Sequence, residues 1–205
     1  MSRTIDFYFD FPSPYAYLAH TQLPRIAAEQ NASITYHPFR ILELMKLVGN
    51  RPTTIECKSK GKYAGVDLQR WTKRYGVAFA RNPHARSFDY AALDSGALVA
   101  IADGKGAEYV TALFSGIWAK QTDLSQRSVL IRLLSEVGFD APRLLERADS
   151  ADVVAKLETA TQAAADRGVF GAPTMFVGDE MFFGNDRLDF VTEALRSASQ
   201  RRVNL

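Results

Sequence analysis

Residues 5–20 read IDFYFDFPSPYAYLAH and contain the transition on which the fold depends. The first half is rich in aromatic and branched residues, which favours a β-strand over Ile5–Phe11. Pro12 and Pro14 end that strand, and Pro14 fits the first turn of a helix, where no backbone N–H is needed. Apolar residues then recur at helical spacing as far as Gln30. The stretch predicts a strand that passes directly into a helix.

The residues that follow complete a strand–helix–strand unit. Ile34–Phe39 reads as a second strand after a short turn. The connection between the two strands has the length that a parallel crossover needs. Pro24 lies inside the predicted helix and should kink or interrupt it, because proline removes a backbone hydrogen bond there.

The middle of the chain, residues 42–165, carries the apolar period of helices and no repeat. Breaks rich in glycine separate the helical stretches. The helical period is clearest over the ranges 93–102, 109–118, 129–137 and 153–165, and we expect Asp89, Asp123 and Asp140 to act as N-caps near helix starts.

Strand signals return near the end of the chain. Thr174–Val177 and Met181–Phe183 read as the two strands of a hairpin, and a last helix is expected over Leu188–Ser199. Strands at both ends and helices between them predict an α/β fold with an inserted all-α-helical domain. We expect residues 1–41 and 166–205 to share one sheet and residues 42–165 to form the insertion.

The composition excludes several classes of protein. Lys and Arg number 25 against 23 Asp and Glu, so the net charge of +2 gives no electrostatic case for a nucleic-acid partner. No apolar run is long enough to span a bilayer, and the N-terminus lacks the features of a signal peptide. Cys57 is the only cysteine, which fits a reducing compartment. We expect a soluble cytoplasmic protein with no membrane partner.

Three short segments carry residue types suited to an anionic or peptide-like ligand. Ser13 stands just before a helix, where it can act as N-cap and where free N–H groups attract anions. Residues 169–174, VFGAPT, place Pro173 before an apolar strand, and a cis bond there would leave the preceding backbone open to an extended peptide. Residues 184–187, GNDR, open a helix that can take a carboxylate, while Asp186 can take an ammonium group. Taken singly, a plain cap, a turn proline and an Asx cap are the more common interpretations.

The order of these segments resembles that of a known enzyme family. Residues 10–19, DFPSPYAYLA, together with 169–174 and 184–187, resemble the 2-hydroxychromene-2-carboxylate isomerases, which belong with the kappa-class glutathione transferases and the DsbA-like oxidoreductases. Residues 66–71, VDLQRW, and 173–181, PTMFVGDEM, also resemble isomerase sequence. The likeness covers nearly the whole chain and is looser in the middle. It implies a thioredoxin-like fold with an inserted all-α-helical domain, and glutathione as the cofactor.

The resemblance also implies a role for Ser13. The oxidoreductases carry the first cysteine of Cys-x-x-Cys at this place, whereas residues 13–16 of this chain read SPYA. Dithiol–disulfide exchange is therefore excluded at this position, and Cys57, far along the chain, reads as a buried or incidental thiol. A cysteine-like thiol has a pKa of about 8.5, and a hydroxyl donor at a helix N-terminus favours its thiolate. We expect Ser13 to donate a hydrogen bond to the glutathione sulfur rather than to attack a substrate.

The substrate implied by the resemblance is a small aromatic carboxylate. It is 2-hydroxychromene-2-carboxylate or its open isomer, trans-o-hydroxybenzylidenepyruvate, in the catabolism of aromatic compounds such as naphthalene. Thiolate addition would turn a double bond into a rotatable single bond, and loss of glutathione after rotation would complete the isomerisation. We expect no metal site and no Ser-His-Asp triad, since the three histidines lack any triad context.

Further site residues follow from the resemblance. For glutathione it points to the backbone of Ala172 before Pro173, to Asn185, Asp186 and Arg187 at the γ-glutamyl end, and to Lys60 at the glycyl carboxylate. For the substrate, Asn82 and Arg86 match a family segment of the form Phe-x-x-Asn-x-x-x-Arg, and Lys46 and Asn50 are candidate carboxylate or hydroxyl ligands. Lys46, Lys60 and Arg86 are equally well explained as solvated surface charges.

Departures from the family pattern leave alternatives open. Ala16 replaces a serine, residues 51–59 do not follow the expected loop, and Pro83 and His84 stand beside Asn82. A kappa-class-like glutathione transferase, or an isomerase acting on another aromatic electrophile, would share the same glutathione site. A thiol oxidoreductase is disfavoured by the missing cysteines, and a non-catalytic glutathione-binding module is the alternative of another class. The apolar helices also allow a homodimer.

Overall fold

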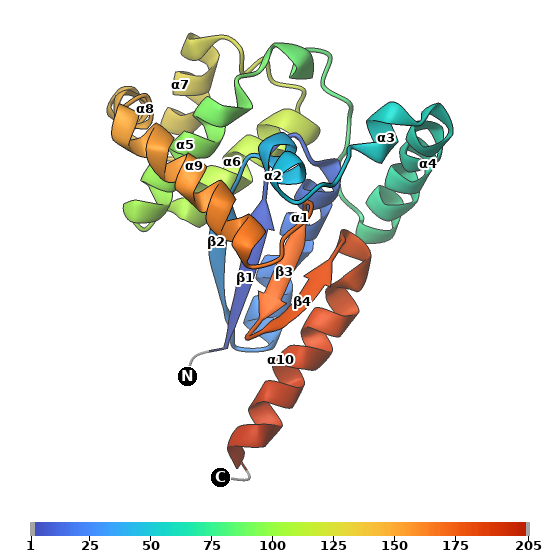
Figure 1. Ribbon diagram of the computed structural model, residues 1–205. Helices are drawn as coiled ribbons and strands as arrows, with labels where there is room; N and C mark the ends of the chain where they lie inside the picture. The colour runs from blue at the N-terminus through green and yellow to red at the C-terminus, as the bar shows by residue number, and fades with distance from the viewer. Residues whose placement is uncertain (1–2, 204–205) are drawn as a thin grey trace.

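A four-stranded sheet with the order β2-β1-β3-β4 organises the computed structural model, which describes residues 3–203. β1, Thr4–Phe9, pairs in parallel with β2, Ser33–Pro38, and antiparallel with β3, Thr174–Val177. β4, Glu180–Phe183, pairs antiparallel with β3 at the edge of the sheet. The strands at the two ends of the chain therefore share one sheet, as the sequence predicts (Figure 1).

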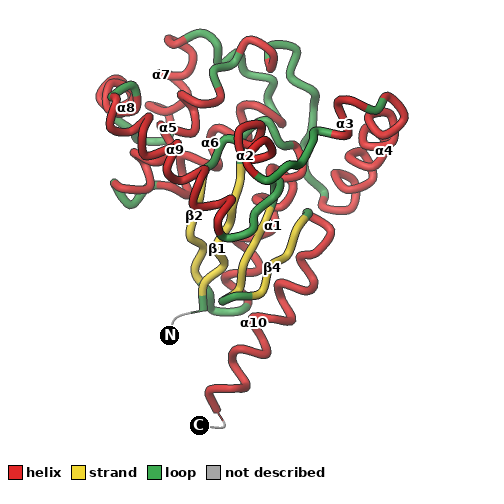
Figure 2. Tube along the Cα trace, viewed as in Figure 1, coloured by secondary structure: helices red, strands yellow, loops and turns green. Residues whose placement is uncertain are grey.

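Helices outnumber strands, and most of them lie between β2 and β3 in the sequence. α1, Pro14–Glu29, connects β1 to β2, and α10, Leu188–Val203, follows β4 after the short 3₁₀ helix η2, Asn185–Arg187. Figure 2 shows most of the remaining helices beyond one end of the sheet. They are α2 Ile41–Leu47, α3 Thr53–Glu56, α4 Lys58–Tyr75, η1 Ala85–Ser87, α5 Tyr90–Ala102, α6 Gly106–Trp118, α7 Arg127–Glu136, α8 Ala141–Ala148 and α9 Ala151–Asp166.

The alternation of side chains along β1 builds two layers of core. Phe7 and Phe9 are fully buried on the face that α1 covers, and α10 contacts both α1 and β3 on this side. Tyr8 points to the opposite face, where it packs with Phe176 and with Phe39 before α2. Burying each of these large side chains contributes about 1.5–3 kcal/mol, so the sheet is held from both sides.

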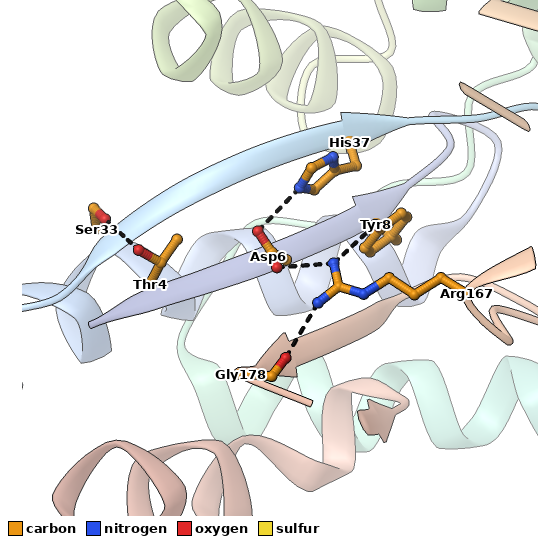
Figure 3. Close-up of polar contacts among 7 residues, drawn as sticks. All are labelled: Thr4, Asp6, Tyr8, Ser33, His37, Arg167 and Gly178. Atoms are coloured by element: carbon orange, nitrogen blue, oxygen red, sulfur yellow. Dashed lines mark hydrogen bonds and ion pairs between the residues drawn. The ribbon is translucent and has the colours of Figure 1, made fainter. Parts of the chain in front are cut away.

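A polar cluster closes the second face at the start of β1 (Figure 3). Asp6 accepts hydrogen bonds from His37 at 3.1 Å and from Arg167 at 2.8 Å. Arg167 also donates to the hydroxyl of Tyr8 at 3.0 Å and to the carbonyl of Gly178 at 3.1 Å. Because Arg167 is the residue that ends α9, these bonds fix where the segment leading to Ala172 begins.

Most sequence expectations for the elements are confirmed, with two corrections. Asp89 caps α5 and Asp140 caps α8 through side-chain hydrogen bonds. Pro24 does not interrupt α1, which runs through it, because buried neighbours hold the turns on either side of the missing hydrogen bond. Asp123 is not an N-cap: α7 begins only at residue 127, and the Asp123 carboxylate instead accepts from Ser125 in the preceding turn.

The helices between β2 and β3 occupy residues 41–166, close to the predicted insertion. α5 and α9 both contact β2, so this helical segment is packed onto the sheet. The division into two domains stays a prediction. Within residues 3–203, no helix combines the length and the apolar character that crossing a bilayer requires.

Candidate functional site

Ser13 occupies the N-terminus of α1 as its N-cap residue. Its Oγ accepts a hydrogen bond from the N–H of Ala16 at 3.2 Å and donates one to the carbonyl of Ala172 at 3.1 Å. Its own N–H donates to the carbonyl of Asp10 at 3.1 Å. The hydroxyl therefore sits where the positive end of the helix dipole and the segment before Pro173 meet.

The second segment approaches Ser13 from the other end of the chain. The peptide bond between Ala172 and Pro173 is cis. The carbonyl of Pro173 accepts from the N–H of Gly184 at 3.0 Å, which joins this segment to the third one. The side chain of Thr174 donates to the carbonyl of Gly171 and fixes the bend before β3.

The third segment contains a buried amide that lacks a partner. Asn185 is 3% exposed, and its Nδ2 has no hydrogen-bond partner in the part of the chain that the structure describes. The backbone carbonyl of Asn185 accepts a hydrogen bond from the hydroxyl of Tyr75 at 2.7 Å, which anchors η2 to the end of α4. The neighbouring side chains of Asp186 and Arg187 form an ion pair on the surface. Because α1 contacts η2, all three segments singled out in the sequence lie together.

A large cavity opens beside Ser13. Its volume is about 1320 Å³, above the usual range of about 300–1,000 Å³ for small-molecule sites. The lining comes from the N-terminus of α1, from α2, from the α3–α4 pair, from the start of α5 and from residues 170–172. These elements are neighbours in Figure 1. Of the predicted site residues, Ser13, Asn50 and Ala172 line this cavity, whereas Lys46, Lys60, Asn82, Arg86, Pro173, Asn185, Asp186 and Arg187 do not.

The two predicted lysines lie apart from the cavity. Lys46 is exposed on α2. Lys60 is exposed on α4 and borders a separate, smaller pocket of about 420 Å³, which Tyr15 shares with the main cavity. Asn50 does border the cavity, and its amide donates to the carbonyl of Phe170 at 2.7 Å. The structure therefore brings Asn50 to Ser13 but places neither lysine in the cavity wall.

The side chain of Asn82, a predicted substrate contact, makes its hydrogen bonds to backbone groups. It is buried, and its Nδ2 donates to the carbonyls of Ile117 and Thr122 at 3.2 and 2.9 Å. Its Oδ1 accepts from the N–H of His84 at 2.9 Å. With these bonds made, the amide faces away from the cavity, and Arg86 is exposed outside it. The preceding residue, Arg81, lines the cavity instead.

Arg81 is a functional candidate that the sequence motif missed by one position. Among residues 3–203, no acidic side chain forms an ion pair with Arg81, whereas the cavity arginines Arg40 and Arg51 pair with Glu43 and with Glu56. An unpaired guanidinium at a cavity wall suits a carboxylate, which it can bind through two hydrogen bonds. No sequence signal separates this arginine from its neighbours, because ion pairing depends on the fold.

Aromatic side chains form another part of the cavity that sequence patterns do not reveal. Phe79 and Trp118 lie in the lining with their rings stacked, 5.8 Å apart and 6° from parallel. The indole N–H of Trp118 donates to the carbonyl of Phe11 at 2.9 Å. This bond holds the stack against the turn that leads to Ser13.

Two buried carboxyl groups border the same cavity. Asp10 is 3% and Asp94 is 1% exposed. Burial raises the pKa of Asp10 to about 7, and burial together with the charge of Asp10 raises the pKa of Asp94 well above its usual range. Asp94 stands in a helix of small apolar residues, and that mismatch was the sequence signal by which it could have been found.

Two other residues of types used in nucleophilic chemistry, His20 and Cys57, lie outside the cavity lining. His20 is buried, which lowers its pKa to about 4, and its Nε2 bonds the hydroxyl of Thr111. The side-chain hydrogen bonds of Ser13 go to backbone groups, so it lacks the histidine of a triad. Cys57 is an exposed free thiol between α3 and α4, so of the two interpretations, a buried or an incidental thiol, the buried one is wrong. Within residues 3–203, no cluster of potential metal ligands occurs.

Comparison with known proteins agrees with the observed fold. A family model described as the DSBA-like thioredoxin domain matches residues 4–196. A 2-hydroxychromene-2-carboxylate isomerase of Sphingobium xenophagum is 38% identical over 95% of this chain and 99% of its own. A solved structure of a 2-hydroxychromene-2-carboxylate isomerase has a TM-score of 0.89 and 31% identity, and the match covers 98% of both chains. A kappa 1 glutathione S-transferase of Homo sapiens is 24% identical over 95% of this chain and 92% of its own.

Proposed function

The chain belongs to the 2-hydroxychromene-2-carboxylate isomerases of the DSBA-like thioredoxin family, and from this premise we propose that it is a glutathione-dependent isomerase. The proposed reaction interconverts 2-hydroxychromene-2-carboxylate and trans-o-hydroxybenzylidenepyruvate. The observation that carries the proposal is the hydroxyl of Ser13 at the N-terminus of α1, facing the carbonyl of Ala172 at the cavity.

Ser13 is suited to hold a thiolate that the protein itself does not supply. A free thiol of pKa about 8.5 is only a few per cent ionised at neutral pH. A hydroxyl donor and the helix N-terminus both favour the anion, and each pKa unit of lowering corresponds to about 1.4 kcal/mol. Ser13 therefore acts as a hydrogen-bond donor to the sulfur of glutathione.

Binding of a ligand to the carbonyl of Ala172 would free the Ser13 hydroxyl to donate its hydrogen bond elsewhere. In the structure the single hydroxyl proton of Ser13 points to the carbonyl of Ala172. A peptide N–H that binds this carbonyl competes with the Ser13 hydroxyl for the oxygen, so the Ser13 proton can turn to sulfur. The N–H of Ala16 keeps the oxygen in place during this exchange. The same contact that recognises the cysteinyl unit thus prepares the hydroxyl for the thiolate.

The residues around η2 fit the γ-glutamyl end of glutathione. The unpartnered Nδ2 of the buried Asn185 is a donor that a carboxylate would satisfy. Asp186 can accept from an ammonium group, and the exposed Arg187 beside it can bind a carboxylate. Lys60 is retained as a candidate for the glycyl carboxylate, at the smaller pocket that adjoins Tyr15.

The rest of the cavity fits a small aromatic carboxylate. We place the substrate carboxylate on Arg81, because no acidic side chain within the described residues 3–203 pairs with this cation. The stacked rings of Phe79 and Trp118 offer an aromatic surface to the substrate ring. Asn50 remains a candidate ligand for a hydroxyl. A volume of about 1320 Å³ can hold the tripeptide and such a substrate together.

When bound, glutathione supplies a nucleophilic sulfur that adds reversibly to the conjugated double bond and so permits rotation about it. Ser13 holds the sulfur in its ionised form, and Arg81 holds the substrate carboxylate through the rotation. The protein groups therefore orient both molecules and stabilise negative charge, which accounts for most of the rate enhancement in many enzymes.

Two further expectations stay predictions. The single, unpaired Cys57 suits the reducing conditions of the cytoplasm. A homodimer would cover exposed apolar side chains such as Phe183 and Phe190. Light scattering on the purified protein tests the homodimer.

The decisive experiment follows the interconversion by ultraviolet absorbance with and without glutathione. We expect turnover that requires glutathione, and a loss of about 100-fold in kcat/KM for Ser13→Ala, the size typical of one lost donor to a developing anion. Ser13→Thr, which keeps a hydroxyl and a helix cap, is the matched control and should retain far more activity. Glutathione binding without turnover would reject this substrate and favour a transferase or an isomerase for another aromatic electrophile.

A further inference from the structure

Asp10 and Asp94 bring two carboxyl groups together at the base of the cavity. Asp10 stands between β1 and α1, three residues before Ser13, and Asp94 lies in α5. Three of their four oxygens, Oδ1 of Asp10 and both oxygens of Asp94, are buried without a hydrogen-bond partner among the residues that the structure describes. The fourth, Oδ2 of Asp10, accepts from the N–H of Ile41 at 2.7 Å.

The hydrogen-bonding capacity of a carboxyl group determines which charge such a pair can carry. An ionised carboxylate can only accept hydrogen bonds, so two carboxylates cannot satisfy each other. A carboxyl that keeps its proton can donate it to the other, which removes the charge repulsion and gives a hydrogen-bond partner to one unpaired oxygen of each group. Asp10 and Asp94 line the same cavity, and an interaction between the two carboxyl groups lowers the pKa of Asp10 and raises that of Asp94.

The charged and titratable neighbours of the pair leave it uncompensated. Arg40 acts on both carboxyl groups, but it is already paired with Glu43. Asp89, at the start of α5, adds a further negative charge near Asp94. Two tyrosines face the pair, Tyr90 from α5 and Tyr109 from α6, where the Tyr109 hydroxyl donates to the carbonyl of Leu93. Burial and the nearby carboxyls raise the pKa of both tyrosines, so they stay neutral and do not compensate charge.

The pair is connected to the parts of the site that must be placed accurately. The carbonyl of Asp10 accepts from the N–H of Ser13 at 3.1 Å, and its carboxyl holds the N–H of Ile41 at the start of α2. Ile41 and Ser13 both line the cavity. A movement of Asp10 would therefore shift the turn that carries Ser13 and the α2 wall together.

We propose that Asp10 and Asp94 share one proton in the active protein, and that this shared proton positions the Ser13 turn against the α2 wall of the cavity. The two aspartates are positioning residues for the glutathione site. Loss of the shared proton places two like charges side by side in a buried space, which drives Asp10 away from Asp94 and displaces Ser13. The role of Ser13 rests on the proposed function, but the shared proton does not.

The first test detects the shared proton directly in the wild-type protein. Carbon-13 NMR of side-chain carboxyls, with assignments from the Asp94→Asn variant, follows both groups between about pH 4 and about pH 9. We expect one of the two carboxyls to remain protonated at about pH 6, where an ordinary aspartate is fully ionised. Two carboxyls that are both ionised at that pH overturn the proposal.

The second test asks whether the proton controls the glutathione site. S-methylglutathione, which has no thiol to titrate, is bound to wild type and to Asp94→Asn at about pH 6.5 and about pH 8.5. The asparagine amide can donate to Asp10 without a proton that leaves, so a merely structural role would leave the two pH profiles alike. We expect the wild-type affinity to fall at least about 3-fold over this interval and the variant affinity to change less than about 1.5-fold.

The outcomes separate this inference from the proposed function. Identical pH profiles in the two proteins overturn the positioning role, even if the isomerase assay succeeds. Different profiles support it, even if the chromene substrate is not turned over. If Asp94→Asn does not fold, Asp94→Ser with the same ligand takes its place, and the carboxyl titration of the wild type still decides whether a proton is shared.

Discussion

The two ends of β1 hold aspartates in opposite states. At the start of the strand, Asp6 is partly exposed; burial acts to raise its pKa, but the hydrogen bonds and charges of His37 and Arg167 outweigh it and lower the pKa (Figure 3). Just past the other end, Asp10 is buried beside Asp94, and its pKa is raised to about 7. The same residue type, four positions apart, has its pKa lowered in one place and raised in the other.

The two ends of β1 differ in whether their polar groups have protein partners, and the candidate functional site lies at the end where buried groups lack them. The start of β1 satisfies its charges with the protein's own residues, so it contributes stability and leaves nothing for a ligand. The other end leaves buried polar groups without partners, and Ser13 and the cavity lie there. Unsatisfied polar groups are tolerated in folded proteins mainly where function needs them.

The largest expected effect is the difference in stability between two single variants, Asp10→Ala at one end of β1 and Asp6→Ala at the other. Asp10→Ala leaves Asp94 buried without a partner and the N–H of Ile41 without an acceptor. We expect the free energy of unfolding to fall by about 3 kcal/mol, typical of breaking a buried pair. Asp6→Ala removes a partly exposed ion pair and should cost about 1 kcal/mol or less. Urea denaturation near neutral pH measures both, and equal losses would contradict the comparison.

A second experiment compares two arginines, one in the cavity lining and one outside it, for their effect on substrate binding. Arg81→Gln removes the unpaired cation of the cavity, and we expect KM for the chromene carboxylate to rise about 10-fold with a smaller change in kcat. Arg86→Gln is the matched control, because Arg86 is an exposed arginine outside the cavity. Steady-state kinetics of both variants measure KM and kcat for the chromene carboxylate. A larger rise in KM for Arg86→Gln would return the substrate carboxylate to the residue that the sequence motif indicates.

Local sequence chemistry was sufficient where neighbouring residues alone determine the structure. Pro14 in the first helical turn and the Ser13 cap place the start of α1, and the aromatic and branched residues before them predict the strand β1. Pro24 misled because residues far along the chain pack around that turn and hold it.

The site required long-range information that no motif carries. Arg81 and Asn82 are adjacent, and only the fold shows that the arginine faces the cavity while the amide holds the backbone of Ile117. Asp10 was visible in its motif, but its partner Asp94 comes from a helix 84 positions later. Pairings of this kind depend on packing, which hydrophobic period and local propensity do not determine.

A third variant tests whether the two ends act independently. Arg167 ends α9 and binds Asp6, Tyr8 and Gly178, so Arg167→Gln should lower the free energy of unfolding by about 1 kcal/mol. We expect glutathione affinity to stay within about 2-fold of wild type, because Arg167 does not reach the cavity. Calorimetric titration and denaturation measure the two quantities. A strong loss of affinity would show that Arg167 also positions the segment that carries Ala172.

The last comparison concerns pH dependence, which separates the two aspartates. The lowered pKa of Asp6 means that its stabilisation is complete above the unfolded-state value of about 4 and is lost as the pH falls through the folded-state value. The raised pKa of Asp10 acts in the opposite direction: the folded protein holds an extra proton, so this contribution weakens as the pH rises from about 4 to about 7. Denaturation of wild type and Asp6→Asn from about pH 6 to about pH 3 should show their difference in stability shrinking towards acid. The difference between wild type and Asp94→Asn should instead change in favour of wild type over the same range. If both differences change in the same direction, the two aspartates are not in opposite states.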